Sequence, residues 1–272
     1  MINKVQKQPE SQLRHLQRVI LSIAKDIDEL CRQNGIKYYL VGGSAIGAVR
    51  HHGFIPWDDD LDIIMDDYNY KRFLQIAQEQ LDKDKYFVCE GRVDWPLYFT
   101  KVKLKNTHLQ EHEGRWTSDT DGIYVDVFKM DNVSNNKLIA RWQYFCGKYY
   151  MSYLLAQRTY GSASVFKRII MFMTFPLKVS VIRNFVVKQS EKYNNTETKF
   201  YGFFHGRNRY KSSVIRKDLF GEPLYVPFED TMLPIQERYQ EYLTQVFGDY
   251  MKLPPEEKRV GLHLIDVDFG EY

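Results

Sequence analysis

The sequence predicts an α/β fold, a small mixed sheet flanked by helices, with a basic helical insertion and a C-terminal helix. Over the first 131 residues, short segments with the two-residue period of strands alternate with segments that have the 3.6-residue period of helices. Residues 132–198 then change sharply in composition, and a helical pattern returns near the end of the chain. We therefore expect a core at 1–131, an insertion at 132–198 and a C-terminal part of the same domain at 199–272.

The first elements follow from the spacing of apolar residues. Apolar side chains recur every three or four residues over 11–31, which predicts an amphipathic helix, and Asn34 with the glycine after it is a typical stop. The segment IKYYLVGG predicts a short strand that runs into a glycine turn. A second helix is expected from Ser44 to about His52, and Pro56 makes FIPWDD an extended loop.

The next elements complete the predicted sheet. The segment DLDIIM alternates carboxylate and apolar side chains, so a strand there would point Asp60 and Asp62 to the same side. YNYKRFLQIAQEQL predicts a helix, LYFTKVKL and GIYVDVFKM predict strands, and the last of these carries Asp126 between apolar neighbours. The segment QERYQEYLTQVFG predicts the C-terminal helix.

The predicted insertion has an unusual charge pattern. Between Asn132 and Ser190 there are nine Lys or Arg residues and no Asp or Glu, and aromatic residues are dense. Two or three helices with this composition suit contact with anionic lipid head groups, or a nucleic-acid surface. They would also suit an insertion whose aromatic side packs on the core and whose basic side is merely solvated.

Composition limits the class of protein. With 272 residues, 44% of them hydrophobic, the chain can bury a sizeable core, and its net charge of +3 does not by itself indicate a nucleic-acid partner. Three scattered cysteines without a C-x-x-C pair argue against disulfides or a cysteine zinc site and indicate a reducing compartment. Neither a signal peptide nor an apolar run of the ~18 residues that a spanning helix needs is evident, so we expect a cytoplasmic protein.

Carboxylates are concentrated in VGGSAIGAVRHHGFIPWDDDLDIIM, residues 41–65. Asp58, Asp59, Asp60 and Asp62 repel one another at neutral pH, and a bound divalent cation would offset that repulsion. Asp126 on a neighbouring strand would complete a set of hard oxygen ligands of the kind that Mg²⁺ or Mn²⁺ takes. Strand alternation turns Asp59 to the opposite side, which makes it the weakest candidate of the four.

A glycine turn precedes these carboxylates. Gly42, Gly43 and Ser44 place backbone N–H groups at the start of a helix, where free donors and the helix dipole favour an anion such as phosphate. Each motif alone is common in loops without function. The ordered combination of a glycine turn, a D-x-D strand and a later lone aspartate is far more specific and predicts a metal-bound phosphate.

The combination resembles the nucleotidyltransferase superfamily and, more closely, the LicD family of phosphocholine transferases, which includes the fukutin-related proteins. The resemblance rests on GGSAIGAVRHHGFIPWDDDLDIIM, on GIYVDVFKMD and on a final block of FED with YLTQVFGDYMKLPPEEKR. The sequence departs from the family at FKMD, where a proline commonly follows the phenylalanine, and around His263, whose context is looser than usual.

This resemblance implies a transferase that moves phosphocholine from CDP-choline to a hydroxyl of a cell-surface glycan precursor (teichoic acid, capsule or lipopolysaccharide) and releases CMP. It implies that Asp60, Asp62 and Asp126 hold Mg²⁺, with Asp58 as a further ligand or a support. CDP-ribitol or CDP-glycerol as donor, a nucleotidyltransferase that uses an NTP, and a membrane-docking scaffold without turnover remain alternatives. Because such acceptors are carried on membrane lipids, we expect peripheral contact with the inner face of the membrane through 132–190 and no nucleic-acid partner.

Residues near the predicted metal site have more than one interpretation. Arg50 would clamp the donor diphosphate or pair with the aspartates. One of His51 and His52, or Asp126 if it binds no metal, would be the general base. Trp57 would stack on a base or on a trimethylammonium group, or anchor its loop.

Residues outside this motif complete the candidates. Lys101 and Lys103 share a strand face; they would either contact phosphate or belong to a face of the sheet that is only solvated. Glu229 and Arg259 belong to the final block and are counted with the substrate-binding residues, Arg259 as a phosphate ligand; Lys258 from the same block has no assigned role.

Overall fold

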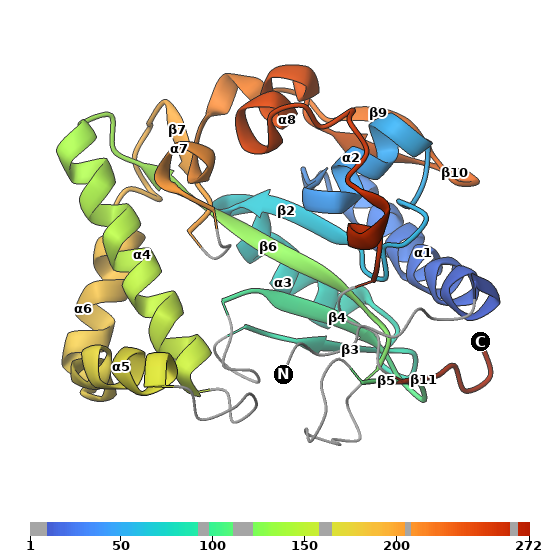
Figure 1. Ribbon diagram of the computed structural model, residues 1–272, viewed down its shortest axis with the longest axis horizontal. Coiled ribbons are helices and arrows are strands. Elements are labelled where there is room, and N and C mark those ends of the chain that lie inside the picture. The colour runs from blue at the N-terminus through green and yellow to red at the C-terminus, as the bar shows by residue number, and fades with distance from the viewer. Residues whose placement is uncertain (1–9, 92–97, 111–121, 158–164, 205–207, 262–265) are drawn as a thin grey trace.

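The computed structural model describes residues 10–91, 98–110, 122–157, 165–204, 208–261 and 266–272 (Figure 1). A seven-stranded sheet has the order β1–β2–β6–β4–β3, and β7 continues it from the far end of β6 to β8. Its strands are β1 Tyr39–Leu40, β2 Asp62–Asp66, β3 Tyr86–Cys89, β4 Thr100–Leu104, β6 Tyr124–Val133, β7 Phe200–Gly202 and β8 Val214–Arg216. Strands β2 and β6 are parallel while the other neighbours are antiparallel, which confirms an α/β fold with a mixed sheet.

Three helices belong to the N-terminal half: α1 Glu10–Gln33, α2 Gly42–His51 and α3 Asp67–Gln80. Helices α1 and α3 both contact β6, and their apolar side chains enter one hydrophobic cluster with the sheet. Helix α1 ends at a glycine, Gly35, with φ of 59°, and α3 starts where the Asp66 carboxylate accepts a hydrogen bond from the Asn69 N–H. Both helices lie where the apolar periodicity predicts them.

The C-terminal part completes the core of the N-terminal half. It contains α7 Tyr210–Ser213, η2 Lys217–Leu219, the hairpin β9 Leu224–Phe228 and β10 Thr231–Ile235, α8 Tyr239–Phe247 and η3 Glu256–Lys258. Near the C-terminus, β11 Asp266–Asp268 pairs with β5 His108–Gln110. Phe220, Phe228 and Tyr242 are buried in the same cluster as Ile20 and Phe73. Residues 199–272 therefore share one hydrophobic core with the first half of the chain.

The insertion is helical, as predicted: α4 Lys137–Gln157, α5 Val165–Met173, η1 Phe175–Lys178 and α6 Ser180–Ser190. These helices stand to one side of the sheet (Figure 1) and bury a cluster of their own around Cys146, Tyr150 and Leu177. Among the helices of the described residues, none combines the length and the apolarity that a bilayer crossing demands.

A buried charged network joins the insertion to the sheet. The Lys129 ammonium on β6 lies 2.8 Å from Asp131, 3.3 Å from Asp67 and 2.9 Å from Glu191, the residue that follows α6. Burial lowers the pKa of Lys129, but the neighbouring carboxylates of Asp131 and Glu191 outweigh it and raise the pKa well above its usual value. The charge on Lys129 thus fastens the insertion to the core.

Two boundaries differ from the prediction. Strand β2 begins at Asp62, because ladder pairing starts only where the Leu61 carbonyl accepts from the Asp126 N–H at 3.0 Å; Asp60 therefore precedes the strand. Helix α2 begins at Gly42, so the glycines form its first turn, and they leave only two residues of the predicted IKYYLVGG segment in β1.

Candidate functional site

The first turn of α2 lies directly against the start of β2. The Asp62 N–H donates to Ser44 Oγ at 2.9 Å, and the Val41 N–H donates to the Asp62 carbonyl at 3.1 Å. Gly42 has φ of 64°, and a Cβ there would lie 3.0 Å from Asp62 Oδ2. Glycine is therefore required at 42 both for its conformation and for the close approach of a carboxylate.

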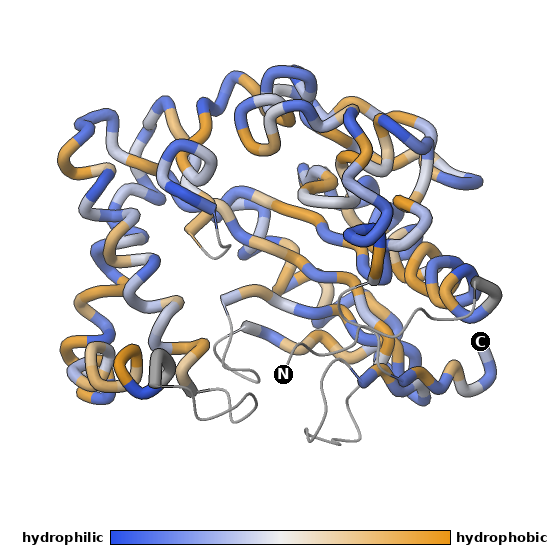
Figure 2. Tube along the Cα trace, viewed as in Figure 1, coloured by the Kyte–Doolittle hydropathy of each residue, from blue (hydrophilic) through white to orange (hydrophobic). Residues whose placement is uncertain are grey.

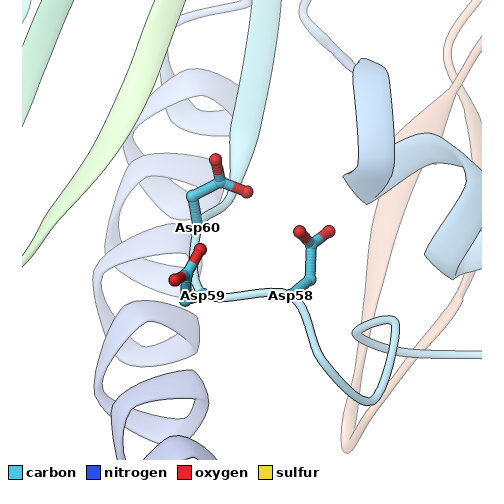
Figure 3. Close-up of side chains that lie close together, drawn as sticks. All are labelled: Asp58, Asp59 and Asp60. Atoms are coloured by element: carbon cyan, nitrogen blue, oxygen red, sulfur yellow. The ribbon is translucent and has the colours of Figure 1, made fainter. Parts of the chain in front are cut away.

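The loop before β2 brings three further carboxylates to the same place (Figure 3). Asp58, Asp59 and Asp60 each offer an oxygen, and these oxygens lie within 4.8 Å of one another. A Cβ on Gly43 would lie 2.4 Å from Asp58 Oδ2, so this carboxylate also abuts the first turn of α2. Asp59 joins the group although strand alternation would have turned it away, because residues 58–60 are loop; it is buried against Gly261.

Register places the last two acidic candidates side by side. Asp62 on β2 is directly opposite Asp126 on the parallel strand β6, and Lys101 on β4 is opposite Asp126 from the other side. The Lys101 ammonium lies 3.6 Å from Asp126 Oδ1 and 3.2 Å from the centre of the Tyr124 ring. Lys101 is therefore a buried neighbour of the site, and the solvated sheet face considered for it does not occur.

The carboxylates raise one another's pKa values. Burial raises the pKa of Asp58 well above its usual value, and the charges of Asp60 and Asp59 add to it. Burial likewise raises the pKa of Asp62, with contributions from Asp60, Asp126 and Asp58 that outweigh the opposing effect of Lys101. Both shifts have the cause expected for like charges gathered away from water.

This donor set fits a hard divalent cation. Asp58, Asp59, Asp60, Asp62 and Asp126 supply only oxygen ligands, the type that Mg²⁺ and Mn²⁺ take, and positive charge would relieve the repulsion that raises the pKa values. Val41, the residue before α2, offers no side-chain hydrogen bond to the N-terminus of the helix. The helix dipole there can therefore attract an anion beside the carboxylates.

A group of aromatic and basic side chains contains residues that flank the carboxylates in sequence and one residue, Arg259, from near the end of the chain. The Arg259 guanidinium stacks over the Trp57 ring at 5.7 Å, and the His51 ring meets Trp57 edge-on at 6.3 Å. Arg50 donates to the Tyr250 carbonyl at 2.7 Å and to His51 Nε2 at 2.9 Å. Burial, followed by the charge of Arg50, lowers the pKa of His51.

These contacts bear on the alternatives for Arg50 and Trp57. In the described part of the chain, Arg50 forms hydrogen bonds with backbone carbonyls of residues 250 and 252, and no ion pair between it and the aspartates is found. The Trp57 ring contacts the Arg259 guanidinium and the His51 ring, so the indole lies between a cation and a histidine.

Glu229 serves to hold the acidic loop. Its carboxylate accepts from both terminal nitrogens of Arg14, at 3.2 and 2.9 Å, and from the Phe54 N–H at 3.1 Å. Arg14 in turn donates to Gln17 at 2.5 Å, and Gln17 donates to the Asp58 carbonyl at 2.8 Å. Glu229 thus braces the loop through α1, and the substrate contact expected of it stays a prediction.

The remaining candidates are less informative. Lys103 is buried on β4, Lys258 is exposed on η3, and His263 lies outside the described residues. Two residues were not anticipated: Gln17, and the buried Tyr242 on α8, whose pKa is raised by burial and by the Asp62 charge. Gln17 could have been noticed as a polar residue next to the apolar stripe of α1, whereas nothing in the sequence places Tyr242 near Asp62.

Comparisons with known proteins agree with this arrangement. Residues 35–161 match the family model of the LicD/FKTN/FKRP nucleotidyltransferase domain, which includes the glycine turn and all five aspartates. The lipopolysaccharide cholinephosphotransferase LicD of Haemophilus influenzae is 27% identical over 267 residues, 93% of this chain and 96% of that protein. The ribitol 5-phosphate transferase FKRP of Mus musculus is 30% identical over 102 residues, which are 36% of this chain and 20% of that protein. The chain therefore contains a domain that matches the LicD/FKTN/FKRP model over residues 35–161, and it is similar to a LicD cholinephosphotransferase along nearly its whole length.

Proposed function

We propose that this protein is a Mg²⁺-dependent transferase that moves phosphocholine from CDP-choline to a hydroxyl of a cell-surface glycan precursor and releases CMP. The observation that carries the proposal is the near full-length similarity to a cholinephosphotransferase, combined with five aspartates around the start of β2, two of which lie against the first turn of α2. The same observations support transfer of a phospho-alcohol more generally, since FKRP is named for ribitol 5-phosphate.

The residues of the chain divide the work of such a transfer. Asp60, Asp62 and Asp126, with Asp58, would hold Mg²⁺, which when bound would neutralise charge on the diphosphate. The N-terminus of α2 would bind a phosphate oxygen through its backbone N–H groups. Arg259 would bind a phosphate group, and Trp57, whose ring lies beneath the Arg259 guanidinium, would offer an aromatic face to the nucleotide base or to the trimethylammonium group.

The transfer itself exchanges one P–O bond for another. The acceptor hydroxyl oxygen forms a bond to the β-phosphorus as the bond between that phosphorus and the CMP oxygen breaks. The hydroxyl proton passes to a base of the site, for which the candidates are one of His51 and His52, or Asp126 if it binds no metal. His51 Nε2 accepts a hydrogen bond from Arg50, so Nδ1 of the neutral ring carries the proton, and His51 could act as the base only after this hydrogen bond breaks.

The proposed acceptor sets the location. Glycan precursors of this kind are carried on membrane lipids, so we propose that the protein works at the inner face of the cell membrane.

The test is phosphorus NMR of the purified protein with Mg²⁺, a lipid-linked glycan fraction and CDP-choline, CDP-ribitol, CDP-glycerol or an NTP. CMP formation from CDP-choline that Asp60→Asn and Asp62→Asn abolish, and that the exposed control Asp84→Asn keeps, would support the proposal. If CDP-ribitol or CDP-glycerol is consumed instead of CDP-choline, the proposed reaction type is kept and only the identity of the donor changes. Release of pyrophosphate from an NTP would replace the proposal with a nucleotidyltransferase activity.

A further inference from the structure

The tip of the insertion, residues 168–188, exposes large apolar side chains within 132–190, a stretch that contains no acidic residue. Phe172 is 82% exposed, Val181 75% and Phe175 61%, and Ile169, Met173 and Phe185 are also exposed. They come from α5, η1 and α6, which belong to the helices at one side of the sheet (Figure 2). Soluble surfaces rarely gather so many large apolar groups without a partner.

The inward side of the same helices is already filled. Cys146, Tyr150 and Leu177 are buried together with Val186 and Val187. The exposed side chains therefore do not pack on the core, and the explanation in which the aromatic side of the insertion is internal does not hold for the tip.

A row of aromatic rings extends the exposed surface along α4. Trp142 stacks on Phe145 at 5.7 Å, and Phe145 stacks on Tyr149 at 5.9 Å. The Tyr149 hydroxyl donates to the Met173 carbonyl at 2.7 Å, which joins this row to the tip. Trp142 and Phe145 are themselves exposed.

Cations surround these apolar groups. Arg168, Lys178 and Lys188 are exposed on α5, η1 and α6, while 132–190 contains no Asp or Glu. An apolar surface whose own helices carry cations and no acidic residue is complementary to a bilayer that presents anionic head groups and, beneath them, acyl chains. A second protein would need an acidic rim and an apolar centre of matching shape, and a nucleic acid would leave the phenylalanines and valines exposed to water.

From these observations we propose that the tip, residues 168–188, docks the protein on an anionic membrane surface. Phe172, Phe175 and Val181 enter the boundary between head groups and acyl chains, and Arg168, Lys178 and Lys188 pair with lipid phosphates. Helix α5 has nine residues, so it is only about 13 Å long and lies in the interface. The inference does not depend on the proposed transfer, because docking is measurable without any substrate.

The test is flotation of the full chain with vesicles of phosphatidylglycerol and phosphatidylcholine in equal parts, against vesicles of phosphatidylcholine alone. We expect binding to the anionic vesicles only, weakened by high salt. The double variant Phe172→Ser, Phe175→Ser should reduce partitioning at least about tenfold, and Lys178→Glu by about fivefold or more. Matched controls are Met232→Ser on the β9–β10 hairpin and Lys83→Glu after α3, both at exposed positions, which should bind as the wild type does.

Three results would overturn the proposal. The first is equal binding by the tip variants and the controls, and the second is no binding of the wild type to anionic vesicles. The third is a stable dimer in solution that the double variant converts to a monomer, which would show that a second copy covers the tip. Circular dichroism of each variant separates loss of docking from loss of folding, and the phosphorus NMR assay reports separately on the transfer.

Discussion

Replacing Asp60 with asparagine should stabilise the metal-free protein while it removes the response to divalent cations. In the absence of a cation, the carboxylates of Asp58, Asp59 and Asp60 repel one another, and the native state bears this cost. Asparagine keeps the size of the side chain and retains an N–H that can donate to Asp58, so the hydrogen bond between the two residues survives. Only the charge is lost.

The magnitude follows from the separation of the charges. At 4.8 Å, two unit charges repel by about 3.5 kcal/mol at an effective dielectric constant of about 20, and by about 0.9 kcal/mol in water. Asp60 takes part in two such pairs with Asp58 and Asp59, but it is only half-buried, and the raised pKa of Asp58 lets a proton relieve part of the repulsion. We therefore expect a gain of about 1–3 kcal/mol in the free energy of unfolding, or about 2–10 °C in Tm for a chain of this size.

The assay is thermal unfolding at neutral pH, in EDTA and in a series of Mg²⁺ or Mn²⁺ concentrations. The wild type should gain about 2.7 kcal/mol when the cation is at a hundred times its Kd, whereas Asp60→Asn should respond much less. Asp84→Asn, in the turn between α3 and β3, is the control and should respond like the wild type. A lower Tm of Asp60→Asn in EDTA, or an undiminished response to cations, would refute the reasoning.

Three further substitutions separate structure from function. Gly43→Ala places a methyl group 2.4 Å from Asp58 Oδ2, so the rate of transfer should fall at least about tenfold. The Tm should stay unchanged, because alanine favours the helix. Measurements of the rate and of Tm on the same variant check both expectations. Glu229→Gln should cost about 1 kcal/mol at neutral pH. Because the hydrogen bond from Arg14 lowers the pKa of Glu229 below 4.5, its contribution is complete above that pH and is lost on acidification through the folded-state pKa, so the Tm difference between variant and wild type should vanish there. Lys129→Met leaves three carboxylates without their shared cation and should lower the free energy of unfolding, measured with urea, by about 3–5 kcal/mol. A loss below about 1 kcal/mol would contradict the role of Lys129 in attaching the insertion to the sheet.

The parts of the fold that the sequence predicted are those with a regular period. Helix α1 was predicted because its apolar spacing is determined locally and extends over many residues, whereas the helices of the insertion were predicted from its composition. The strand with Asp62 was predicted, but its start was placed two residues early, at Asp60. The alternation of D-x-D fits a strand even where no neighbouring strand is available for hydrogen bonding. Register with β6, which no local pattern encodes, set the true boundary at the Leu61 carbonyl.

The candidate site divides in the same way. Residues close in sequence, such as Gly43 and Asp58, could be linked from their motif, and so could Asp62 and Asp126 once both were assigned to neighbouring strands. Contacts that depend on tertiary packing could not. The buried position of Lys101 against Asp126 and the approach of α8 to Asp62 arise from how distant segments fold over the sheet, and neither has a local signature.

The structure also explains why the supports of the acidic loop lie outside its motif. Mutual repulsion of the carboxylates pushes the loop apart, so its backbone must be held by groups that do not compete for the carboxylate oxygens. Gln17 does this by donating to the carbonyls of Ile55 and Asp58, and Arg14 places Gln17 while it binds Glu229. Every one of these contacts leaves the aspartate side chains available to a cation. The carboxylates proposed to bind the cation and the groups that hold their loop in place therefore belong to different residues. Gln17 on α1 supports the proposed chemistry through the backbone of the loop.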